Sequence, residues 1–464
     1  MLEREYRREM DAVTLTAEQK EKLADVMTGT ARAPRAGRAG RTALVAAAVC
    51  AVLAVSALAY VTGALDFLRG REEYQFLGQA DLYEEYARRA GLSAQADNGD
   101  TLTIEYTAMD ENFCTVFYTL ETAEPMEAWS RRADLPISPD APDLWQAAGL
   151  APRFALEADG AVLTGGQDGQ QYLLDANTLV GMARLPLLRA GALETGESVT
   201  LKAGPSLEAW GGGGGWTGTD WAEAEQWSFQ LTAQPMEGRT HTLPAPAALG
   251  ERQVESLSVT VSPLGAVLRA RVTVPGEYRA EPGLWGGLGW FVARDEAGRY
   301  YPYDILTSAP SEDGAAWEEA YILYGLEDAE TLEILPAELE GEFADVGLED
   351  LPWQGQGAYT FASFDLAEGQ MTLRLEPDGP VGSTGYCGNV TYFLDDEGEK
   401  LFYGDGAPDI YQNRYTDWRD GSVTVTWSLD EAGQAQAERL AGLTLYAETY
   451  VPQEGTGIRL TLTE

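Results

Sequence analysis

The sequence predicts a mainly β protein, with tandem β-sandwich-like domains outside the cell, one transmembrane helix and a short helical arm in the cytoplasm. Three observations support this fold class. An uncharged run lies near the N-terminus, apolar and polar residues alternate with period two through much of the remaining chain, and short motifs recur 100 to 114 residues apart. Because 464 residues exceed what one core accommodates, we expect several domains.

The transmembrane helix is predicted from residues 42–65, TALVAAAVCAVLAVSALAYVTGAL, which carry no charge and lie between Arg41 and Asp66. A helix needs about 20 apolar residues to cross the hydrocarbon core of a bilayer, so this run is long enough. Five basic residues occur in the twenty positions before the run and two in the twenty after it. Since basic residues resist translocation, we expect a single-pass protein of the cell membrane, with its N-terminus in the cytoplasm and its C-terminal bulk outside.

A secretory signal peptide is the alternative interpretation of the same run. Ala57-Leu58-Ala59 has the small-x-small pattern of a cleavage site after Ala59. However, 41 residues with helical patterning precede the run, whereas the charged segment of a signal peptide is short. The run also continues past the cleavage pattern, so an uncleaved anchor is favoured.

Charge is distributed unevenly along the chain, whose formal net charge is -42. The first 41 residues hold nine of the 32 basic and seven of the 74 acidic residues, and the predicted span holds none, so the residues from Asp66 onward hold 23 and 67. Their net charge of -44 opposes binding to phosphate backbones, and we expect no direct binding to nucleic acid. Two interpretations stay open: the acidity keeps the protein soluble, or it attracts cationic ligands or metal ions.

Residues 1–41 predict a cytoplasmic arm of two short amphipathic helices followed by a basic linker. Apolar residues recur at helical spacing in both segments, and the second begins with the capping-box pattern of Thr16 and Gln19. Helices this short bury little apolar area alone, so they require either a protein partner or the membrane surface. The residues we expect to contact a partner are Leu15, Leu23, Val26 and Met27.

Residues 66–245 are predicted to hold a juxtamembrane helix and the first outer β domain. Helical spacing of apolar residues indicates the helix over 77–90. Beyond it, TLTIEYTAM and FCTVFYTLET flank the turn Asp110-Glu111-Asn112 and predict a hairpin. A strand beginning at Trp227, WSFQLTAQP, is predicted to close this domain.

Residues 246–365 and 366–464 are predicted to be a second and a third β domain, the third being a repeat of the second. SVTVSPLG resembles TLRLEPDG at an offset of 114 residues, and DAETLEIL resembles RLAGLTLY at an offset of about 111. Between these motifs, the turn at 295–298 resembles the turn at 395–398. Because the three matches share one order, we expect two similarly folded sandwiches with Gly298 and Gly398 at equivalent hairpin turns.

We predict no catalytic residue, no metal ligand and no cofactor, and therefore a protein that is not an enzyme. The five glycines at 211–215 lack the Gly-Lys-Ser/Thr of a phosphate-binding loop. The acidic hairpin turns lack the ligand spacing of a calcium loop, and the three cysteines and one histidine include no Cys-x-x-Cys pair and no zinc-ligand spacing. His241 has no nucleophile motif nearby and is interpreted as a surface residue.

The cysteines and tryptophans are interpreted as structural. Cys50 lies in the predicted span, and Cys114 and Cys387 belong to different domains, so two separate buried thiols are favoured over a disulfide. Four tryptophans fit either a sugar-binding platform or core packing, and packing is favoured because aromatic residues dominate sandwich cores. They are Trp129, Trp285, Trp290 and Trp353.

The order of parts resembles a known family. The pattern YRREMDAVTLTAEQKEKLADVM, a basic linker, one membrane span and then NGDTLTIEYTAMDENFCTVFYTLET is similar to single-pass membrane proteins of Gram-positive bacteria that carry an extracellular β domain and are regarded as anti-sigma factors. The resemblance implies an arm that binds an extracytoplasmic-function sigma factor and an outer part that senses envelope conditions. The chain lacks the His-x-x-x-Cys-x-x-Cys motif of the zinc-binding anti-sigma class.

The sequence thus predicts a membrane-anchored anti-sigma factor or envelope-stress sensor that acts in signal transduction and regulates transcription. Its partners would be a sigma factor inside and an extracellular ligand of unknown identity outside. The alternative is a non-enzymatic binding or adhesion module at the cell surface that recognises glycan or protein through its β domains.

Overall fold

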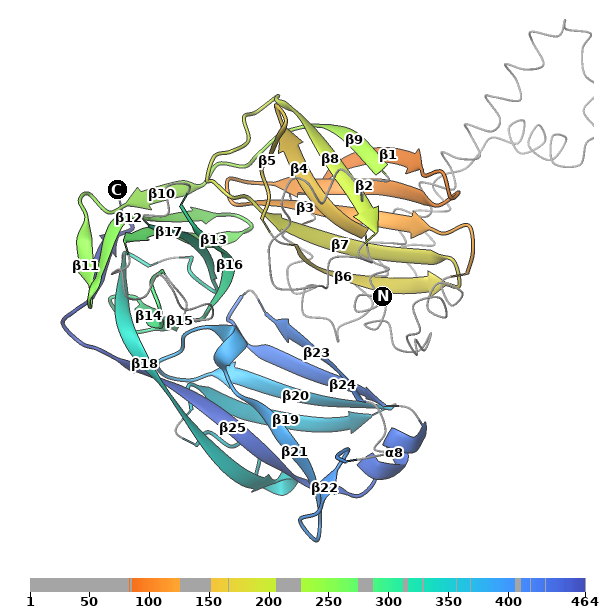
Figure 1. The fold of residues 1–464 in the computed structure, drawn as a ribbon, viewed down its shortest axis with the longest axis vertical. Coiled ribbons are helices and arrows are strands. Elements are labelled where there is room, and N and C mark those ends of the chain that lie inside the picture. Colours follow the sequence, from red (N-terminus) through yellow and green to blue (C-terminus); the bar gives the residue numbers. More distant parts are fainter. Residues whose placement is uncertain are drawn as a thin grey trace, which may run out of the picture. The chain divides into compact units, whose positions relative to one another are not determined.

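A computed structural model describes residues 83, 86–125, 152–165, 167–205, 227–273, 287–311, 316–327, 329–355, 357–367, 369–404, 410–417, 419–429 and 431–463. The predicted arm, 1–41, and the predicted span, 42–65, lie outside these residues. Within them the protein is mainly β, with antiparallel sheets and little helix (Figure 1). No helix of the described part is long and apolar enough to cross a membrane.

The first domain is a sandwich of two antiparallel sheets. One sheet has the order β1 (Arg88–Gln95), β2 (Thr101–Met109), β3 (Phe113–Glu121), β7 (Thr178–Pro186), β6 (Asp168–Asp175), and the other has the order β5 (Ala161–Val162), β4 (Pro152–Ala158), β8 (Ser198–Pro205), β9 (Trp227–Thr232). Both sheets contribute to one core, for example Val116 from β3 and Leu201 from β8. The predicted hairpin is β2–β3 and the predicted strand at Trp227 is β9, so both predictions are confirmed.

The helix predicted over 77–90 is wrong at its C-terminal end. Tyr83 and Tyr86 are helical, but Arg88 already belongs to β1. Strand β1 pairs with β2, and its backbone hydrogen bonds to that neighbour outweigh the local helical pattern.

The second domain repeats this arrangement. One sheet has the order β10 (Arg239–Thr242), β12 (Arg252–Ser262), β13 (Gly265–Thr273), β17 (Trp317–Leu323), β16 (Tyr303–Pro310), with β11 (Ala247–Leu249) also on β12; the facing strands are β15 (Tyr300–Tyr301), β14 (Phe291–Arg294), β18 (Thr331–Gly347) and β26 (Ile458–Thr461). Its core takes Val259 and Leu268 from the first sheet and Phe291 and Ile334 from the facing strands.

The third domain has the same plan. One sheet has the order β19 (Tyr359–Ala367), β20 (Gln370–Pro377), β24 (Val423–Leu429), β23 (Ile410–Thr416); the facing strands are β22 (Lys400–Leu401), β21 (Asn389–Asp395), β25 (Leu440–Pro452) and the second half of β18. Phe361 and Leu373 face Phe393 and Leu445 in its core. The short elements η3 (Leu348–Asp350), η4 (Thr384–Tyr386) and α8 (Glu431–Ala437) lie in its connections.

All three domains share one seven-stranded topology. The sheet β2-β3-β7-β6 corresponds to β12-β13-β17-β16 and to β19-β20-β24-β23, while β5-β4-β8 corresponds to β15-β14-β18 and to β22-β21-β25. The sequence predicted this likeness for the second and third domains only. In the first domain the strands are separated by longer insertions, such as 126–150 between β3 and β4, which obscure the repeat in the sequence.

The predicted equivalence of the two acidic turns is confirmed. Asp295 and Asp395 accept hydrogen bonds from backbone N–H groups two and four residues ahead, and Gly298 and Gly398 both have a φ of 82°. The match between DAETLEIL and RLAGLTLY also falls on corresponding strands, β18 and β25. The match between SVTVSPLG and TLRLEPDG is wrong, because SVTVS lies in β12 and TLRLEP in β20, whose counterpart is β13.

The second and third domains exchange strands. The first half of β18 pairs with β14 and β26, and its second half, from Ala337 to Gly347, pairs with β25. The chain leaves β25 and returns to the second domain as β26. The predicted boundary between residues 365 and 366 falls inside β19, and the one between 245 and 246 falls between β10 and β11, which both pair with β12.

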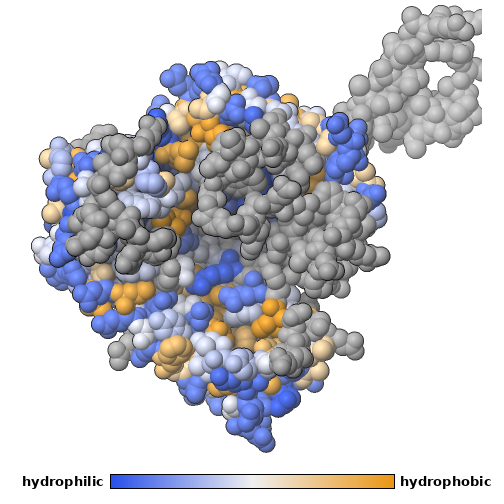
Figure 2. Space-filling model, in the orientation of Figure 1, coloured by the Kyte–Doolittle hydropathy of each residue, from blue (hydrophilic) through white to orange (hydrophobic). Residues whose placement is uncertain are grey.

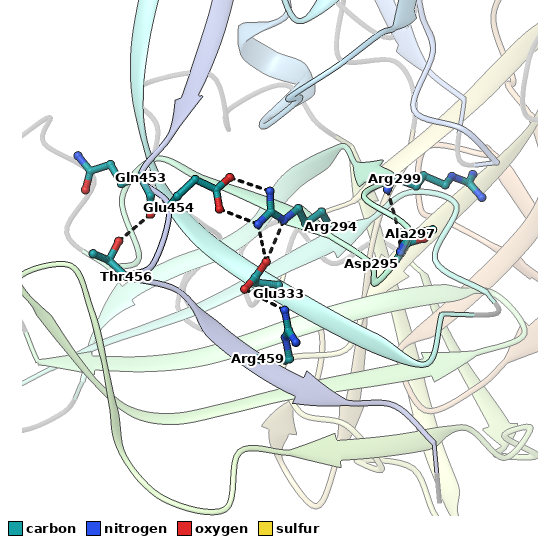
Figure 3. A network of polar contacts seen from close by, with 9 residues as sticks. All are labelled: Arg294, Asp295, Ala297, Arg299, Glu333, Gln453, Glu454, Thr456 and Arg459. Atoms are coloured by element: carbon teal, nitrogen blue, oxygen red, sulfur yellow. Dashed lines mark hydrogen bonds and ion pairs between the residues drawn. The ribbon is translucent and has the colours of Figure 1, made fainter.

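An ion-pair network lies at this exchange. The guanidinium of Arg294 on β14 donates to both carboxylate oxygens of Glu454, at 2.7 and 2.8 Å, and to Glu333 on β18 at 2.8 Å (Figure 3). Arg459 on β26 donates to Glu333 at 3.3 Å. We call these four residues the arginine clamp. It joins β14, β18, β26 and the connection that follows β25.

Candidate functional site

The residues predicted to contact a cytoplasmic partner are not placed by the structure. Leu15, Leu23, Val26 and Met27 lie outside the described residues. Their role stays a prediction, and the site has to be sought in the β domains.

The described part of the chain contains no group of three or more His, Cys, Asp or Glu side chains that could hold a metal ion. Asp295 and Asp395 use carboxylate oxygens to accept backbone N–H groups of their own turns, which explains the acidic residue there without a metal. His241 lies half-buried on β10 and lines a pocket together with Arg239 and Glu330.

The cysteine interpretation is confirmed: Cys114 and Cys387 are free and buried. Burial raises the pKa of the Cys114 thiol to about 12 and that of the Cys387 thiol to about 11. Two of the four tryptophans are described, and both pack against core aromatics. Trp290 lies edge-on to Tyr450, and Trp353 contacts Phe361, so packing is confirmed for these two. Trp129 and Trp285 lie outside the described residues.

The tip of the β2–β3 hairpin makes a buried polar contact with the second domain. Asp110 is fully buried, and its Oδ1 accepts the N–H groups of Asn112 at 2.8 Å and Phe113 at 2.7 Å. Its Oδ2 accepts the N–H of Leu264, in the turn between β12 and β13, at 2.7 Å. Burial raises the pKa of the Asp110 carboxyl, and these hydrogen bonds oppose the rise.

Asn112 links the two hairpins through its side-chain amide. Its Nδ2 donates to the carbonyl oxygens of Thr260 at 2.8 Å and Gly265 at 3.0 Å. Its Oδ1 accepts a hydrogen bond from Arg269 at 2.9 Å, and Arg269 also donates to the carbonyl of Leu187 at 3.0 Å. Burial lowers the pKa of Arg269 to about 10. We call Asp110, Asn112, Arg269 and the groups they contact the hairpin junction.

Close packing surrounds the hairpin junction. The guanidinium carbon of Arg184 lies 3.7 Å from the centroid of the Phe113 ring. Gly265 has a φ of 139°, and a side chain there would press against both Arg184 and Phe113. Glycine is therefore required at this position for the two hairpins to meet.

A second polar contact joins the second and third domains. The Asp304 carboxylate on β16 accepts hydrogen bonds from the hydroxyls of Thr384, in η4, and Tyr324, the latter at 3.0 Å. The N–H of Tyr303 donates to the carbonyl of Gly382 at 3.0 Å. Burial raises the pKa of Asp304. Together with the arginine clamp, this contact ties the third domain to the second.

Exposed aromatic rings gather on the outer face of the sheet formed by β18, β25, β21 and β22. Phe343 and Tyr403 are 68% and 65% exposed, well above other large apolar side chains in the described residues. Phe343 pairs with Tyr446 across the strands, with ring centroids 4.7 Å apart. The Tyr392 ring lies edge-on to Tyr403 at 5.6 Å. We call Phe343, Tyr446, Tyr392 and Tyr403 the aromatic face.

Polar groups lie among these rings. Asp345 is opposite Thr444, which donates to its carboxylate at 2.6 Å, and Thr444 is in turn opposite Tyr392. Glu448, two residues from Tyr446 on the same strand, is half-buried; burial raises the pKa of its carboxyl, and Arg414 and the backbone N–H of Gly388 oppose the rise. The ammonium of Lys400 lies 3.2 Å from the centroid of the Tyr392 ring. Figure 2 shows that hydrophilic residues are widespread on the side in view, with smaller hydrophobic patches among them.

The sequence interpretation missed both the hairpin junction and the aromatic face. Asp110 and Asn112 were identified as turn residues, which they are, but their contact with β12–β13 depends on a pairing of distant hairpins. The aromatic face had a weak local signal: Phe343 stands in LEGEFADVG, where its neighbours of the same parity, Gly341 and Asp345, are not apolar. An isolated ring in such a row indicates an exposed aromatic residue rather than a core position.

Comparison with known proteins adds a partial family match. Residues 37–122 match the family described as "Domain of unknown function (DUF4179)". This range contains the predicted span and continues through β1, β2 and β3, including the tip of the hairpin. The comparison with curated proteins found no match.

Among solved structures, the chain is similar to the conserved domain protein from Bacillus anthracis, with 12% identity and a TM-score of 0.37, over 82% of this chain and 93% of that chain. A likeness to Dpr2 Ig1-Ig2 in complex with DIP-Theta Ig1-Ig3 has 7% identity and a TM-score of 0.12, over 79% and 98%. Both scores are too low to bear on function. Residues 37–122, which end just after β3, are thus similar to the DUF4179 family.

Proposed function

We propose that the protein is a single-pass membrane protein whose cytoplasmic arm, residues 1–41, binds an extracytoplasmic-function sigma factor and whose β domains sense conditions outside the cell. The observation that supports the anchored outer part is the extent of the DUF4179 match, which joins the predicted span to the β2–β3 hairpin. The match begins at residue 37, so the role of the arm rests on the resemblance of its sequence to anti-sigma factors. The tip of that same hairpin makes the hairpin junction with the second domain.

The mechanism would require that an event on the distal domains reaches the membrane-proximal one. The described contacts support such coupling. The arginine clamp and the strand exchange connect the third domain to the second, and the hairpin junction connects the second to the first. A ligand or a cleavage that favours one state of the outer part would then release the sigma factor by shifting a two-state equilibrium.

The experiment is a pull-down with residues 1–41 as bait and a co-expressed sigma factor as prey, followed by a reporter assay with the full chain. Leu23→Asp places a charge on the apolar stripe of the predicted second helix. We expect at least about tenfold weaker binding and higher transcription from the sigma-dependent promoter, because loss of a buried Leu contact costs about 1 to 3 kcal/mol.

The matched control is Thr28→Asp, which adds the same charge away from the stripe. It should leave binding unchanged. If the arm binds no sigma factor, or if both variants bind as tightly as the wild type, the anti-sigma role is wrong.

A second candidate function is favoured by the aromatic face. Four aromatic side chains on one face of a sheet, two of them more than 60% exposed, are typical of a surface that binds another molecule. The protein would then be a membrane-anchored binding or adhesion module without a sigma factor. Ligand binding by the outer domains together with a negative pull-down of the arm would favour this candidate.

A further inference from the structure

We propose that the aromatic face of the third domain binds a cationic peptide segment, by stacking lysine or arginine side chains on its rings beside Asp345. The inference gives a ligand class to the outer part of the proposed function and rests on that part alone. It concerns residues in the β domains, so the sigma-factor experiment on the arm can fail without affecting it.

Two rings of the aromatic face are exposed to solvent. Most of the surface of Phe343 and Tyr403 is accessible, although neighbouring positions of the same sheet are buried in the core of the domain. Singly exposed apolar residues are ordinary, but here four rings lie on one face in two pairs. Aromatic residues so grouped offer a large contact area at little conformational cost.

The electrostatic character of the rings also favours a cation. The face of an aromatic ring attracts a cation, and this interaction strengthens when the pair is withdrawn from water. Lys400 already shows the geometry within the chain, since its ammonium lies over Tyr392 and 5.1 Å from the centroid of Tyr403. The Phe343–Tyr446 pair has no such cation in the described contacts, although Phe343 is exposed.

The charge around the rings is complementary to that of a cationic ligand. Asp345 is exposed and lies two residues from Phe343 on β18, next to the Phe343–Tyr446 pair. A cationic side chain on these rings would therefore also meet a carboxylate. Residues from Asp66 onward carry a net charge of -44, which attracts cationic chains from a distance and repels anionic ones such as phosphate polymers. A neutral glycan would stack on the rings but would gain nothing from the acidic residues.

The test uses the full chain in a neutral detergent and a fluorescent 15-residue peptide of alternating Lys and Leu, with a Glu-for-Lys version as its counterpart. Binding is measured by fluorescence polarisation at low and at high salt. We expect the Lys peptide to bind, the Glu peptide not to bind, and the affinity to fall as salt rises.

The variants are Phe343→Thr and Tyr446→Thr, which keep a residue suited to strands at exposed or half-exposed positions. Each should weaken binding of the Lys peptide about tenfold or more, without a change in the thermal unfolding midpoint. The matched control is Leu366→Thr, an exposed apolar residue on β19, outside the aromatic face, which should bind like the wild type.

Three results would overturn the proposal. Equal binding of the Lys peptide by all variants would show that the general acidity binds it rather than the aromatic face. Absence of binding at low salt would exclude a cationic ligand. Binding of a chito-oligosaccharide that depends on Phe343 and Tyr446, with no such dependence for the peptide, would assign the face to glycan.

Discussion

At the scale of single residues, Asp110, Asn112 and Arg269 of the hairpin junction each make two or more hydrogen bonds. Asn112 shows this most clearly, since its amide meets backbone carbonyls of the second domain and a guanidinium at once. Each of these hydrogen bonds adds only modestly to the stability of the fold. Removal of the side chain is costly mainly because its buried partners would be left without a hydrogen bond.

Replacement of Asn112 by Ala should destabilise the protein by about 2 kcal/mol or more, because buried carbonyls and Arg269 would each lose a partner. The measurement is the midpoint of urea unfolding. Asn389→Ala, at an exposed position of β21, is the matched control and should change stability by less than about 0.5 kcal/mol. Equal, small effects of the two changes would contradict the described hairpin junction.

The burial of Cys114 and Cys387 determines how fast the folded protein reacts with a thiol reagent. With pKa values raised to about 12 and 11, Cys114 and Cys387 carry almost no thiolate at pH 8, and burial also denies the reagent access. In a Cys50→Ser background we expect no fast reaction with an aromatic disulfide reagent in the native state and two equivalents after unfolding in urea.

An exposed cysteine supplies the control for that measurement. Asp97→Cys, in the exposed turn before β2, should add one fast-reacting thiol to the native protein. Fast reaction of the parent protein, or fewer than two thiols after unfolding, would show that the cysteines are exposed or paired.

At the scale of elements, β18 is the strand that connects the second and third domains. Its first half completes the second domain and its second half lies beside β25 in the third, while β26 fills the same edge position on β18 that β9 fills on β8. The arginine clamp stabilises this exchange from the surface.

The pH dependence of the clamp follows from Glu454. Hydrogen bonding to Arg294 lowers the pKa of Glu454, so its contribution is fully present above the ordinary pKa of a glutamate and is lost as pH falls through the lowered value. Wild type should therefore be more stable than Glu454→Gln at pH 6, and the difference in the free energy of unfolding should be smaller at pH 3.

Urea unfolding of both proteins at the two pH values measures this. Glu251→Gln, in an exposed turn, serves as the control and should change the free energy of unfolding by less than about 0.5 kcal/mol. A Glu454→Gln difference that is constant with pH would mean that the ion pair does not stabilise the exchange.

Local sequence patterns predicted individual strands better than they predicted which strands pair with one another. The alternation in TLTIEYTAM and FCTVFYTLET predicted the β2–β3 hairpin because both strands and their turn are contiguous. The end of the helix over 77–90 could not be predicted, since it is decided by pairing of β1 with β2. The exchange through β18 and β26 joins residues between 95 and 130 positions apart, and nothing in either segment specifies its partner.

At the scale of the whole molecule, one topology occurs three times, and the copies contact one another through polar clusters and exchanged strands. The sequence predicted the second copy from the acidic turns, where backbone geometry demands Asp and Gly at fixed positions. Neither the first copy nor the aromatic face contains such a fixed turn motif. The place of a strand in a sheet and the exposure of its side chains depend on tertiary contacts, and many different apolar residues can make those contacts.

The proposed function requires a chain that crosses the membrane with residues 1–41 inside and the β domains outside. The most direct measurement is labelling of intact cells with an impermeant maleimide in a Cys50→Ser background. We expect Asp97→Cys to react in intact cells and Thr30→Cys to react only after lysis. Reaction of Thr30→Cys in intact cells with protection of Asp97→Cys, or loss of residues 1–59 from the mature protein, would contradict the proposed anchored arm and outer sensor.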